Sequence, residues 1–342
     1  MKYISKAPFR IGIAGGGTDV SPYSDRFGGA VLNASIDLHA TVVIIPRDDD
    51  KVIINAINNG VKHEFKATEE LEDFPDLKLQ IGVYNRIVKD FVKKPLPCEI
   101  ITTMDVPTGS GLGTSSTLVV ACIGAFVEWL GLPLGEYDIA QLAVKIERED
   151  LQMAGGKQDQ YAATFGGMNF MEFYENSRVI VNPLRIKSQV LRDLEFHLLL
   201  FYTETQRESS KIIDIQRSNF EKKGSDAINA SHQLKEQAYK MKEAILKGNL
   251  SKIEEPLQVS WENKKKLASG ISNDSINTIY DTAISAGATG GKISGAGGGG
   301  FMIFYCPFNS RFNVIEALGN IGVKWQRYRF QTNGLESWTS QQ

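Results

Sequence analysis

The chain has 342 residues, more than a single hydrophobic core usually organises, so we expect two domains. A hydrophobic content of 42% with 23% charged residues is typical of globular proteins, and a net charge of −2 gives no concentrated basic face for nucleic acid. We expect no membrane partner, because no apolar run reaches the roughly 18 residues of a span and the N-terminus lacks a signal-peptide apolar segment. The three cysteines form no CxxC pair, which argues against disulfides or zinc and favours a cytoplasmic protein.

Alternating apolar and polar residues predict strands in the first half of the chain, at 2–14, 30–46 (two strands), 52–57, 168–174 and 178–184. Helical spacing predicts helices at 77–92, 114–130 and 138–153, the last with Asp138 as its N-cap. The second half is richer in helix, with helices predicted at 225–247, 273–286 and about 309–319 and strands at 196–202, 301–305 and about 323–331. This order predicts an α+β fold whose two domains divide near residue 190.

The stretch from Val106 to Thr117 carries three glycines in five positions, Gly109, Gly111 and Gly113, directly before a predicted helix. Glycine lets the backbone adopt positive φ and approach a ligand closely, and the free N–H groups of a helix N-terminus favour an anion. The stretch therefore predicts a phosphate-binding loop that also offers hydroxyl groups to a metal ion. A glycine-rich turn with a Ser or Thr N-cap would look the same, so the loop alone leaves both interpretations open.

Two common nucleotide motifs are excluded. No glycine run is followed by the Lys-Ser/Thr pair of a P-loop. Gly295, Gly297 and Gly300 match G-x-G-x-x-G, but a strand is predicted after them where a dinucleotide fold needs a helix. The four histidines are scattered and predict structural or surface roles, and the run Lys264-Lys265-Lys266 predicts a solvated helix face.

Three glycine-rich loops occur in order, at 15–17, 109–113 and 295–300, and together they resemble the three motifs of the GHMP kinases. The stretch Pro107 to Ser116 resembles the second motif, P-x-x-x-G-L-G-S-S, with Thr114 where the first Ser is usual. Lys6 to Ile11 with Gly15 to Asp19 resembles the first motif, and Lys292 to Gly300 the third. The resemblance spans nearly the whole chain. It implies an N-terminal domain like domain 2 of ribosomal protein S5 (1–190) and a ferredoxin-like C-terminal domain (191–342).

Two segments, Ala14 to Asp19 and Gly156 to Tyr161, resemble the heptose 7-phosphate kinase branch, which phosphorylates the anomeric hydroxyl of D-glycero-D-manno-heptose 7-phosphate. Fucose and galactose 1-kinases share parts of this pattern, although the Glu-His of galactokinases is absent beside Gly16 and Gly17. The resemblance therefore implies an ATP- and Mg²⁺-dependent sugar kinase that acts on a small sugar or sugar phosphate, and it allows a homodimer. Two alternatives stay open: a non-catalytic sugar or nucleotide sensor on the same fold, and a decarboxylase of the mevalonate branch.

The resemblance also implies roles for individual residues. The ATP phosphates would be bound by Pro107, Gly109, Ser110, Gly111, Leu112, Gly113, Thr114, Ser115 and Ser116, with Gly297 and Gly298 approaching from the second domain. Mg²⁺ would be held by Ser115 and Glu147, with Glu149 as the alternative carboxylate.

Asp159 would accept the sugar hydroxyl proton, and Lys157 would neutralise charge on the transferring phosphate. The alternatives are that Asp159 caps a helix N-terminus, that Glu147 is a charge on a helix surface, and that Lys157 is a surface lysine in solvent. The sugar would be bound by Arg10, Gly16, Gly17, Thr18, Asp19, Asp159 and Gly295, with Arg207 or Lys211 binding a phosphate already on it. These residues predict an active site in the cleft between the domains.

Overall fold

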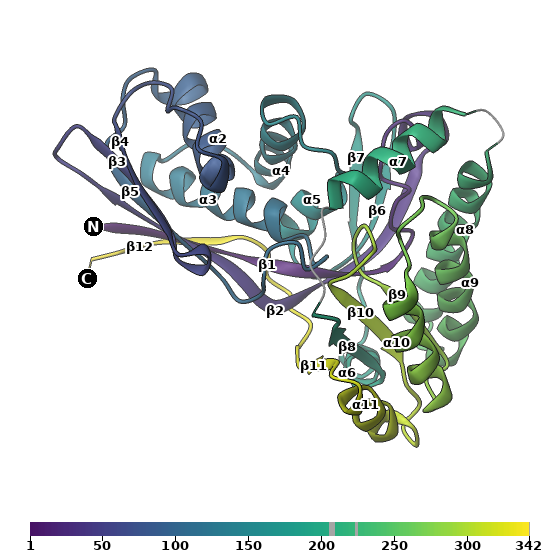
Figure 1. Ribbon diagram of the computed structural model, residues 1–342. Helices are drawn as coiled ribbons and strands as arrows, with labels where there is room; N and C mark the ends of the chain where they lie inside the picture. The colour runs from purple at the N-terminus through teal and green to yellow at the C-terminus, as the bar shows by residue number, and fades with distance from the viewer. Residues whose placement is uncertain (205–208, 223–224, 342) are drawn as a thin grey trace.

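The N-terminal sheet is organised around one long strand, β2 (Gly29–Pro46), which exchanges partners along its length. Its beginning pairs with β6 and its end with β5, while β1 lies along its other edge. The eight strands are β1 (Lys2–Ala14), β2, β3 (Lys51–Ala56), β4 (Val61–Lys66), β5 (Cys98–Met104), β6 (Met168–Phe173), β7 (Val179–Pro183) and β12 (Glu336–Ser340). Only the β3–β5 pair is parallel among the described strand pairs of this sheet. The computed structural model describes residues 1–204, 209–222 and 225–341 (Figure 1).

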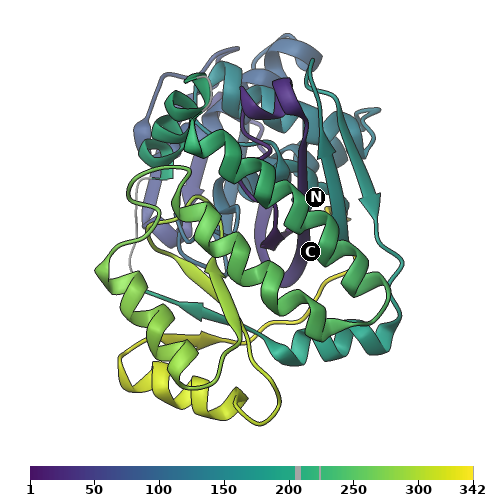
Figure 2. The same ribbon diagram turned by 90° about the vertical axis from the view of Figure 1, so that its right-hand side faces the viewer.

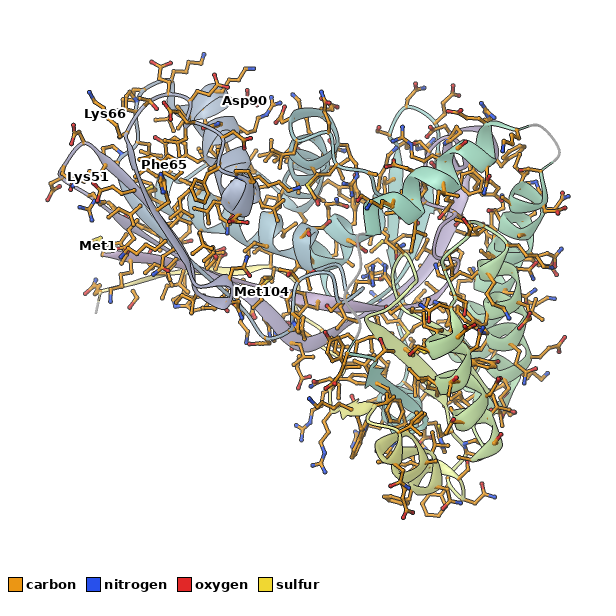
Figure 3. All side chains as sticks on the ribbon, viewed as in Figure 1. Met1, Lys51, Phe65, Lys66, Asp90 and Met104 are labelled. Atoms are coloured by element: carbon orange, nitrogen blue, oxygen red, sulfur yellow. The ribbon has the colours of Figure 1, made fainter. Side chains whose placement is uncertain are left out.

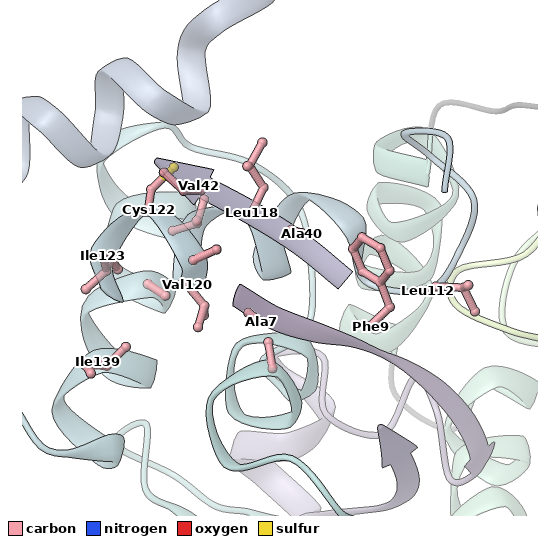
Figure 4. Packing of buried hydrophobic residues seen from close by; sticks show 14 of the residues in the cluster. Ala7, Phe9, Ala40, Val42, Leu112, Leu118, Val120, Cys122, Ile123 and Ile139 are labelled. Carbon is pink, nitrogen blue, oxygen red and sulfur yellow. The ribbon is translucent and has the colours of Figure 1, made fainter. Parts of the chain in front are cut away.

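Helices cover the face of this sheet that carries the core (Figure 1). They are α2 (Lys78–Ile87), α3 (Thr114–Leu130), α4 (Glu136–Lys145) and α5 (Gln158–Phe165), while the short α1 (Tyr23–Phe27) packs with helices of the C-terminal region. The central helix, α3, is apolar along most of its length and packs on β1 and β2 (Figure 4). Phe9 on β1 and Leu118, Val120 and Ile123 on α3 are buried in this core. Burial of side chains of this size contributes about 1.5–3 kcal/mol each, which holds α3 against the sheet.

The strand period is visible at the far end of the sheet, in the β3–β4 hairpin (Figure 3). Phe65 is buried in the core, while the next residue, Lys66, is exposed. Successive strand residues point to opposite faces, so this alternation buries one face of the hairpin against the helices.

The C-terminal region contains an antiparallel four-stranded sheet in the order β11 (Lys324–Gln326), β8 (Leu198–Tyr202), β10 (Phe301–Tyr305) and β9 (Gly290–Ile293). Its helices are α6 (Ser188–His197), α7 (Ser209–Glu221), α8 (Asp226–Leu246), α9 (Glu254–Lys265), α10 (Asp274–Ser285) and α11 (Arg311–Asn320). Helices α8 and α9 lie side by side (Figure 2), and α8 also contacts β1 and β2. The two regions are therefore joined by packing as well as by the chain. None of the described helices is long and apolar enough to cross a bilayer.

The fold confirms the predicted α+β class and most predicted elements, including the 114–130 helix to the residue. Three details were predicted wrongly. Segment 30–46 is one strand, the last predicted strand shrinks to 324–326, and Asp138 lies inside α4. Helix α5, around Asp159, was not among the predicted elements. The Asp138 carboxylate accepts from the Gly135 N–H at 2.9 Å, so it caps the helix from its first turn. Strand β12 was not predicted and pairs with β1, so the predicted C-terminal half contributes a strand to the N-terminal sheet.

Candidate active site

The glycine loop before α3 has the backbone geometry that its composition predicts. Gly109, Gly111 and Gly113 all have positive φ, at 74°, 82° and 80°. At Gly111 a Cβ atom would lie 2.6 Å from the Ser294 carbonyl oxygen, so a larger residue cannot fit there. The loop ends at the N-terminus of a helix of 17 residues, whose first amides lack partners within the helix. This arrangement suits an anion.

The third glycine loop, between β9 and β10, packs directly on the second. The Phe301 N–H donates to the Ser110 carbonyl at 2.9 Å, and the Ser294 hydroxyl donates to the Gly111 carbonyl at 3.1 Å. A Cβ on Gly295 would lie 2.7 Å from the Gly111 carbonyl oxygen. Residues almost 190 positions apart therefore form one continuous wall.

A cleft of about 510 Å³ lies between the two regions at this wall. Its lining draws on β1, the 15–19 loop, α3, the turn after α4 and the start of α5 from one side, and on α7, α9 and the third loop from the other. The predicted site residues that line it are Arg10, Gly17, Asp19, Gly109, Gly111, Gly113, Thr114, Ser115, Ser116, Glu147, Asp159 and Gly295.

Asp159 sits in the first turn of α5 and is held by Arg10 from β1. The Arg10 guanidinium approaches its Oδ1 atom through Nε at 2.7 Å and Nη2 at 2.6 Å, and Arg10 is only 3% exposed. Arg10 Nη1 also donates to the Gly111 carbonyl at 2.8 Å. A Cβ on Gly113 would lie 3.1 Å from the Asp159 Cγ atom. Arg10 thus fixes a carboxylate beside the loop that suits phosphate, while no described residue donates a hydrogen bond to Oδ2.

The Asp19 carboxylate is held by the backbone and side chains around it. Its carboxylate accepts from four N–H groups, namely Gly17 N at 3.2 Å, Lys157 N at 3.0 Å, Gln158 N at 3.2 Å and Gln158 Nε2 at 3.0 Å. A carboxylate has about four acceptor sites, so most of its capacity is used. Its main structural effect is to tie the 15–19 loop to the start of α5.

Glu147 is buried in a π-helical turn that follows α4, Ile146–Asp150, and is 1% exposed. Burial raises the pKa of Glu147, opposed by the charge of Arg148 and by hydrogen bonds from Ser116 and Gln160. The carbonyl oxygen of the Gln160 side chain is buried beside it without a hydrogen-bond partner. A cation would offset the burial of this carboxylate, and the neighbouring hydroxyls are the hard oxygen donors that Mg²⁺ prefers. The donor set therefore fits Mg²⁺, with phosphate and water supplying the other ligands.

The hydroxyl bonded to Glu147 belongs to Ser116, whereas the sequence pointed to Ser115. Ser115 is half-buried and lines the cleft, and Ser116 is buried and also lines it. Both serines therefore line the same cleft as Glu147, and Ser116 is the one that bonds its carboxylate. No group of three or more His, Cys, Asp or Glu side chains forms a metal cluster in the described part of the chain.

Several predicted residues do not line the cleft: Gly16, Pro107, Ser110, Leu112, Lys157, Thr18, Gly297 and Gly298. The Thr18 hydroxyl is buried and donates to the carbonyls of Gly15 at 2.8 Å and Ala30 at 3.0 Å, so it holds its own loop. Gly297 and Gly298 pack on Ile271, whose carbonyl accepts from the Gly298 N–H at 2.8 Å.

The remaining residues of the second motif support the loop from behind. Ser110 joins it to β10 through its carbonyl, Leu112 is in the core, and Pro107 is exposed. The Lys157 ammonium points away from the cleft, with Ser177 Oγ at 3.4 Å and Asp25 Oδ1 at 3.9 Å. Its backbone N–H, bonded to Asp19, is the part that touches the site. Arg207 lies outside the described residues, and Lys211 lies on α7 without lining the cleft.

Two buried lysines were missed from the sequence. Lys292 is 2% exposed and donates to the Gly12 carbonyl at 2.6 Å, and its pKa is lowered well below the usual value by burial. Lys264, predicted to be solvated, is 3% exposed and lines the cleft. Burial lowers the pKa of Lys264 to about 8. The spacing of Leu257, Trp261 and Lys264 along one helical face was the available signal, because the first two are core residues.

Known proteins resemble this chain in sequence and in fold. The chain matches the GHMP kinases N terminal domain over residues 79–167 and the GHMP kinases C terminal domain over residues 241–324. It is 47% identical to the D-glycero-alpha-D-manno-heptose 7-phosphate kinase of Campylobacter jejuni over 98% of each chain. The crystal structure of a D-glycero-D-manno-heptose 1-phosphate kinase from Bacteroides thetaiotaomicron superposes with a TM-score of 0.85 and 40% identity, covering 99% of this chain and 100% of that one.

The galactokinase of Lactococcus lactis in complex with galactose shares the fold, with a TM-score of 0.78 at 20% identity over 98% of this chain and 95% of that one. Both family domains are matched in order, and the similarity to the Campylobacter jejuni enzyme runs along nearly the full length. The chain belongs to the GHMP kinase family of phosphotransferases.

Proposed function

We propose that the chain transfers the γ-phosphoryl group of ATP to the anomeric C1 hydroxyl of D-glycero-D-manno-heptose 7-phosphate, with Mg²⁺ as cofactor. One observation carries the proposal: the Arg10-bound carboxylate of Asp159 lies against Gly113, at the N-terminus of α3. A group that can accept a hydroxyl proton and a loop that suits phosphate therefore share one cleft. Phosphoryl transfer needs this combination of positioning and charge stabilisation.

The identity of the acceptor rests on two relatives whose names differ. The Campylobacter jejuni protein is named for a heptose 7-phosphate and the Bacteroides thetaiotaomicron protein for a heptose 1-phosphate. Both names describe phosphoryl transfer to a heptose that already carries one phosphate. The 7-phosphate is favoured here because the Campylobacter jejuni protein has the higher identity, 47% against 40%.

In the proposed reaction, the amides of the glycine loop and of the first turn of α3 bind the phosphates of ATP. Glu147 with Ser115 and Ser116 would hold Mg²⁺, which when bound neutralises negative charge on the phosphates. The sugar hydroxyl oxygen attacks the γ-phosphorus, the bond to the β-phosphate oxygen breaks, and the hydroxyl proton passes to Asp159. Arg10 orients Asp159 through its Oδ1 atom, which would leave Oδ2 to accept the proton.

The experiment is an ADP-release assay with heptose 7-phosphate, fucose, galactose, mannose and mevalonate as acceptors. We expect turnover with heptose 7-phosphate and at least tenfold lower kcat/KM with the others. Absence of turnover with every sugar would leave a sensor role in its place, and turnover with mevalonate alone would reassign the chain within the family.

The Asp159→Asn variant tests the mechanism separately. We expect kcat to fall by about 100-fold or more, because the amide cannot accept the proton, with the circular dichroism spectrum unchanged. Asp48→Asn, in the exposed turn between β2 and β3, is the matched control and should keep the original kcat. If Asp159→Asn kept full activity, the carboxylate would not be the proton acceptor.

A further inference from the structure

Lys264 is a buried cation in the cleft, and the nearby charges that act on it are those of Asp19 and Arg10. It is 3% exposed and lines the cleft. Its ammonium makes no hydrogen bond or ion pair with any residue in the described part of the chain. Burying an ammonium group without a partner is costly, so such a group is retained where a ligand supplies the missing negative charge.

The charges around Lys264 leave an excess of positive charge. Arg10 and Lys292 act on it with the same sign, and Asp19 with the opposite sign. Arg10 is already paired with Asp159, and Asp19 already accepts from four N–H groups. Within the described part of the chain, the Lys292 ammonium donates only to the Gly12 carbonyl. The part of the cleft around Lys264 therefore favours binding of an anion.

A second cation lines the same cleft. Arg217 on α7 is exposed and lines the same cleft. Its neighbour Gln216 donates to the Gly17 carbonyl at 2.9 Å, and Asn219 donates to the Leu267 carbonyl at 2.9 Å. These two bonds fix α7 against the 15–19 loop and against the end of the segment that carries Lys264. Arg217 and Lys264 are thus held at the same end of the cleft, beside Gly17.

We propose that Lys264, assisted by Arg217, binds the phosphate monoester that the sugar acceptor already carries, and so selects phosphorylated over unphosphorylated sugars. The inference rests on the proposed function, since it assumes a sugar phosphate as acceptor. A phosphate dianion can accept hydrogen bonds both from the compact ammonium of the buried Lys264 and from the forked guanidinium of the exposed Arg217. The helix N-terminus of α3 is a separate anion site, which suits the phosphates of ATP.

The test compares wild type, Lys264→Gln, Lys264→Arg and Arg217→Gln with heptose 7-phosphate and with the same heptose lacking the phosphate. For Lys264→Gln we expect the KM for heptose 7-phosphate to rise at least about 30-fold, with kcat within about threefold and the KM for ATP unchanged. The kcat/KM for the unphosphorylated heptose should stay the same, so the preference of the enzyme for the phosphorylated sugar is lost. Arg217→Gln should raise the KM by about fivefold, because its guanidinium is exposed, and Lys264→Arg should retain part of the preference.

Lys266→Gln is the matched control, because Lys266 is the exposed neighbour on the same segment and does not line the cleft. Calorimetric titration of heptose 7-phosphate into the Asp159→Asn background, with and without Lys264→Gln, measures binding without turnover. An unchanged KM and unchanged binding would overturn the proposal. A rise confined to the KM for ATP would reassign Lys264 to the nucleotide, and a fall in kcat alone would reassign it to the transferring phosphoryl group.

If the proposed kinase function is wrong, these measurements give a different result. In that case wild type turns over no heptose phosphate, so no preference can be lost. Inorganic phosphate titrated into wild type and Lys264→Gln would still report whether Lys264 forms an anion subsite. Equal phosphate binding by the two proteins would then refute the subsite itself.

Discussion

Replacing Lys264 by Met should make the protein more stable while it weakens acceptor binding. Burial lowers the pKa of Lys264 from 10.5 to about 8, because water no longer solvates the ammonium. One pKa unit corresponds to about 1.4 kcal/mol, so holding this charge in the folded state costs about 3 kcal/mol at pH 7. Met fills a similar volume without a charge, and such buried replacements are usually tolerated.

The stability cost of the buried Lys264 charge depends on pH. The unfolded chain binds the Lys264 proton more tightly than the folded chain does. The penalty is therefore complete below pH 8 and disappears as the pH rises from about 8 to 10.5. The stability advantage of Lys264→Met should accordingly be largest at pH 7 and shrink over that interval. Lys292 is present in both proteins, and its pKa is lowered by burial and by the charge of Lys264, so Lys264→Met also relieves repulsion on Lys292.

Urea unfolding at pH 7 and at pH 10 measures the free energy of unfolding of each protein and its change with pH. We expect Lys264→Met to gain about 1–3 kcal/mol at pH 7 and markedly less at pH 10. Lys266→Met, at an exposed position, should stay within about 0.5 kcal/mol of wild type. A Lys264→Met protein that is less stable at pH 7, or whose advantage does not change with pH, would refute the argument that the buried ammonium destabilises the fold.

Two further predictions concern the glycine loop and the metal. Gly111→Ala should unfold at a lower temperature than Gly131→Ala, because both glycines have positive φ but only Gly111 would press a Cβ against Ser294, whereas nothing lies within 4 Å at Gly131. Differential scanning calorimetry compares them, and equal losses of about 1 kcal/mol would mean that only the backbone conformation matters. Chelation should abolish turnover, and Glu147→Gln should raise the Mg²⁺ concentration for half-maximal rate at least tenfold, measured by Mg²⁺ titration of ADP release. An unchanged Mg²⁺ requirement in Glu147→Gln would remove Glu147 from the metal site, and Ser115→Ala against Ser116→Ala decides which hydroxyl assists it.

The sequence predicted the parts of this molecule that depend on local pattern. Helix α3 is recognisable because its apolar run begins after a glycine loop and ends at Gly131, whose φ of 60° terminates the helix. Strand β12 is short and only partly buried, so it has no alternation strong enough to detect, and its place is set by pairing with β1. The three loops were found for the same local reason, since each carries its own glycines.

The roles of single side chains depended on burial, which sequence composition does not report. Lys157 and Lys264 show this most clearly, because the first points away from the cleft while the second lines it. Thr18 is in the predicted loop, yet its hydroxyl is taken up by backbone carbonyls. The choice between Ser115 and Ser116 likewise turns on which side of the α3 first turn faces Glu147.

The pairing of the first strand with the last has a consequence for how the chain can be rewired. Lys2 lies opposite Ser340 in the register of β1 and β12, and the two ends emerge beside each other (Figure 1). A short linker could join them, and new ends could be opened at an exposed turn, giving a circular permutant with the same internal contacts. During synthesis on the ribosome, in contrast, the outer edge of β1 stays uncovered until β12 has emerged. An uncovered strand edge is open to pairing with other chains in that interval.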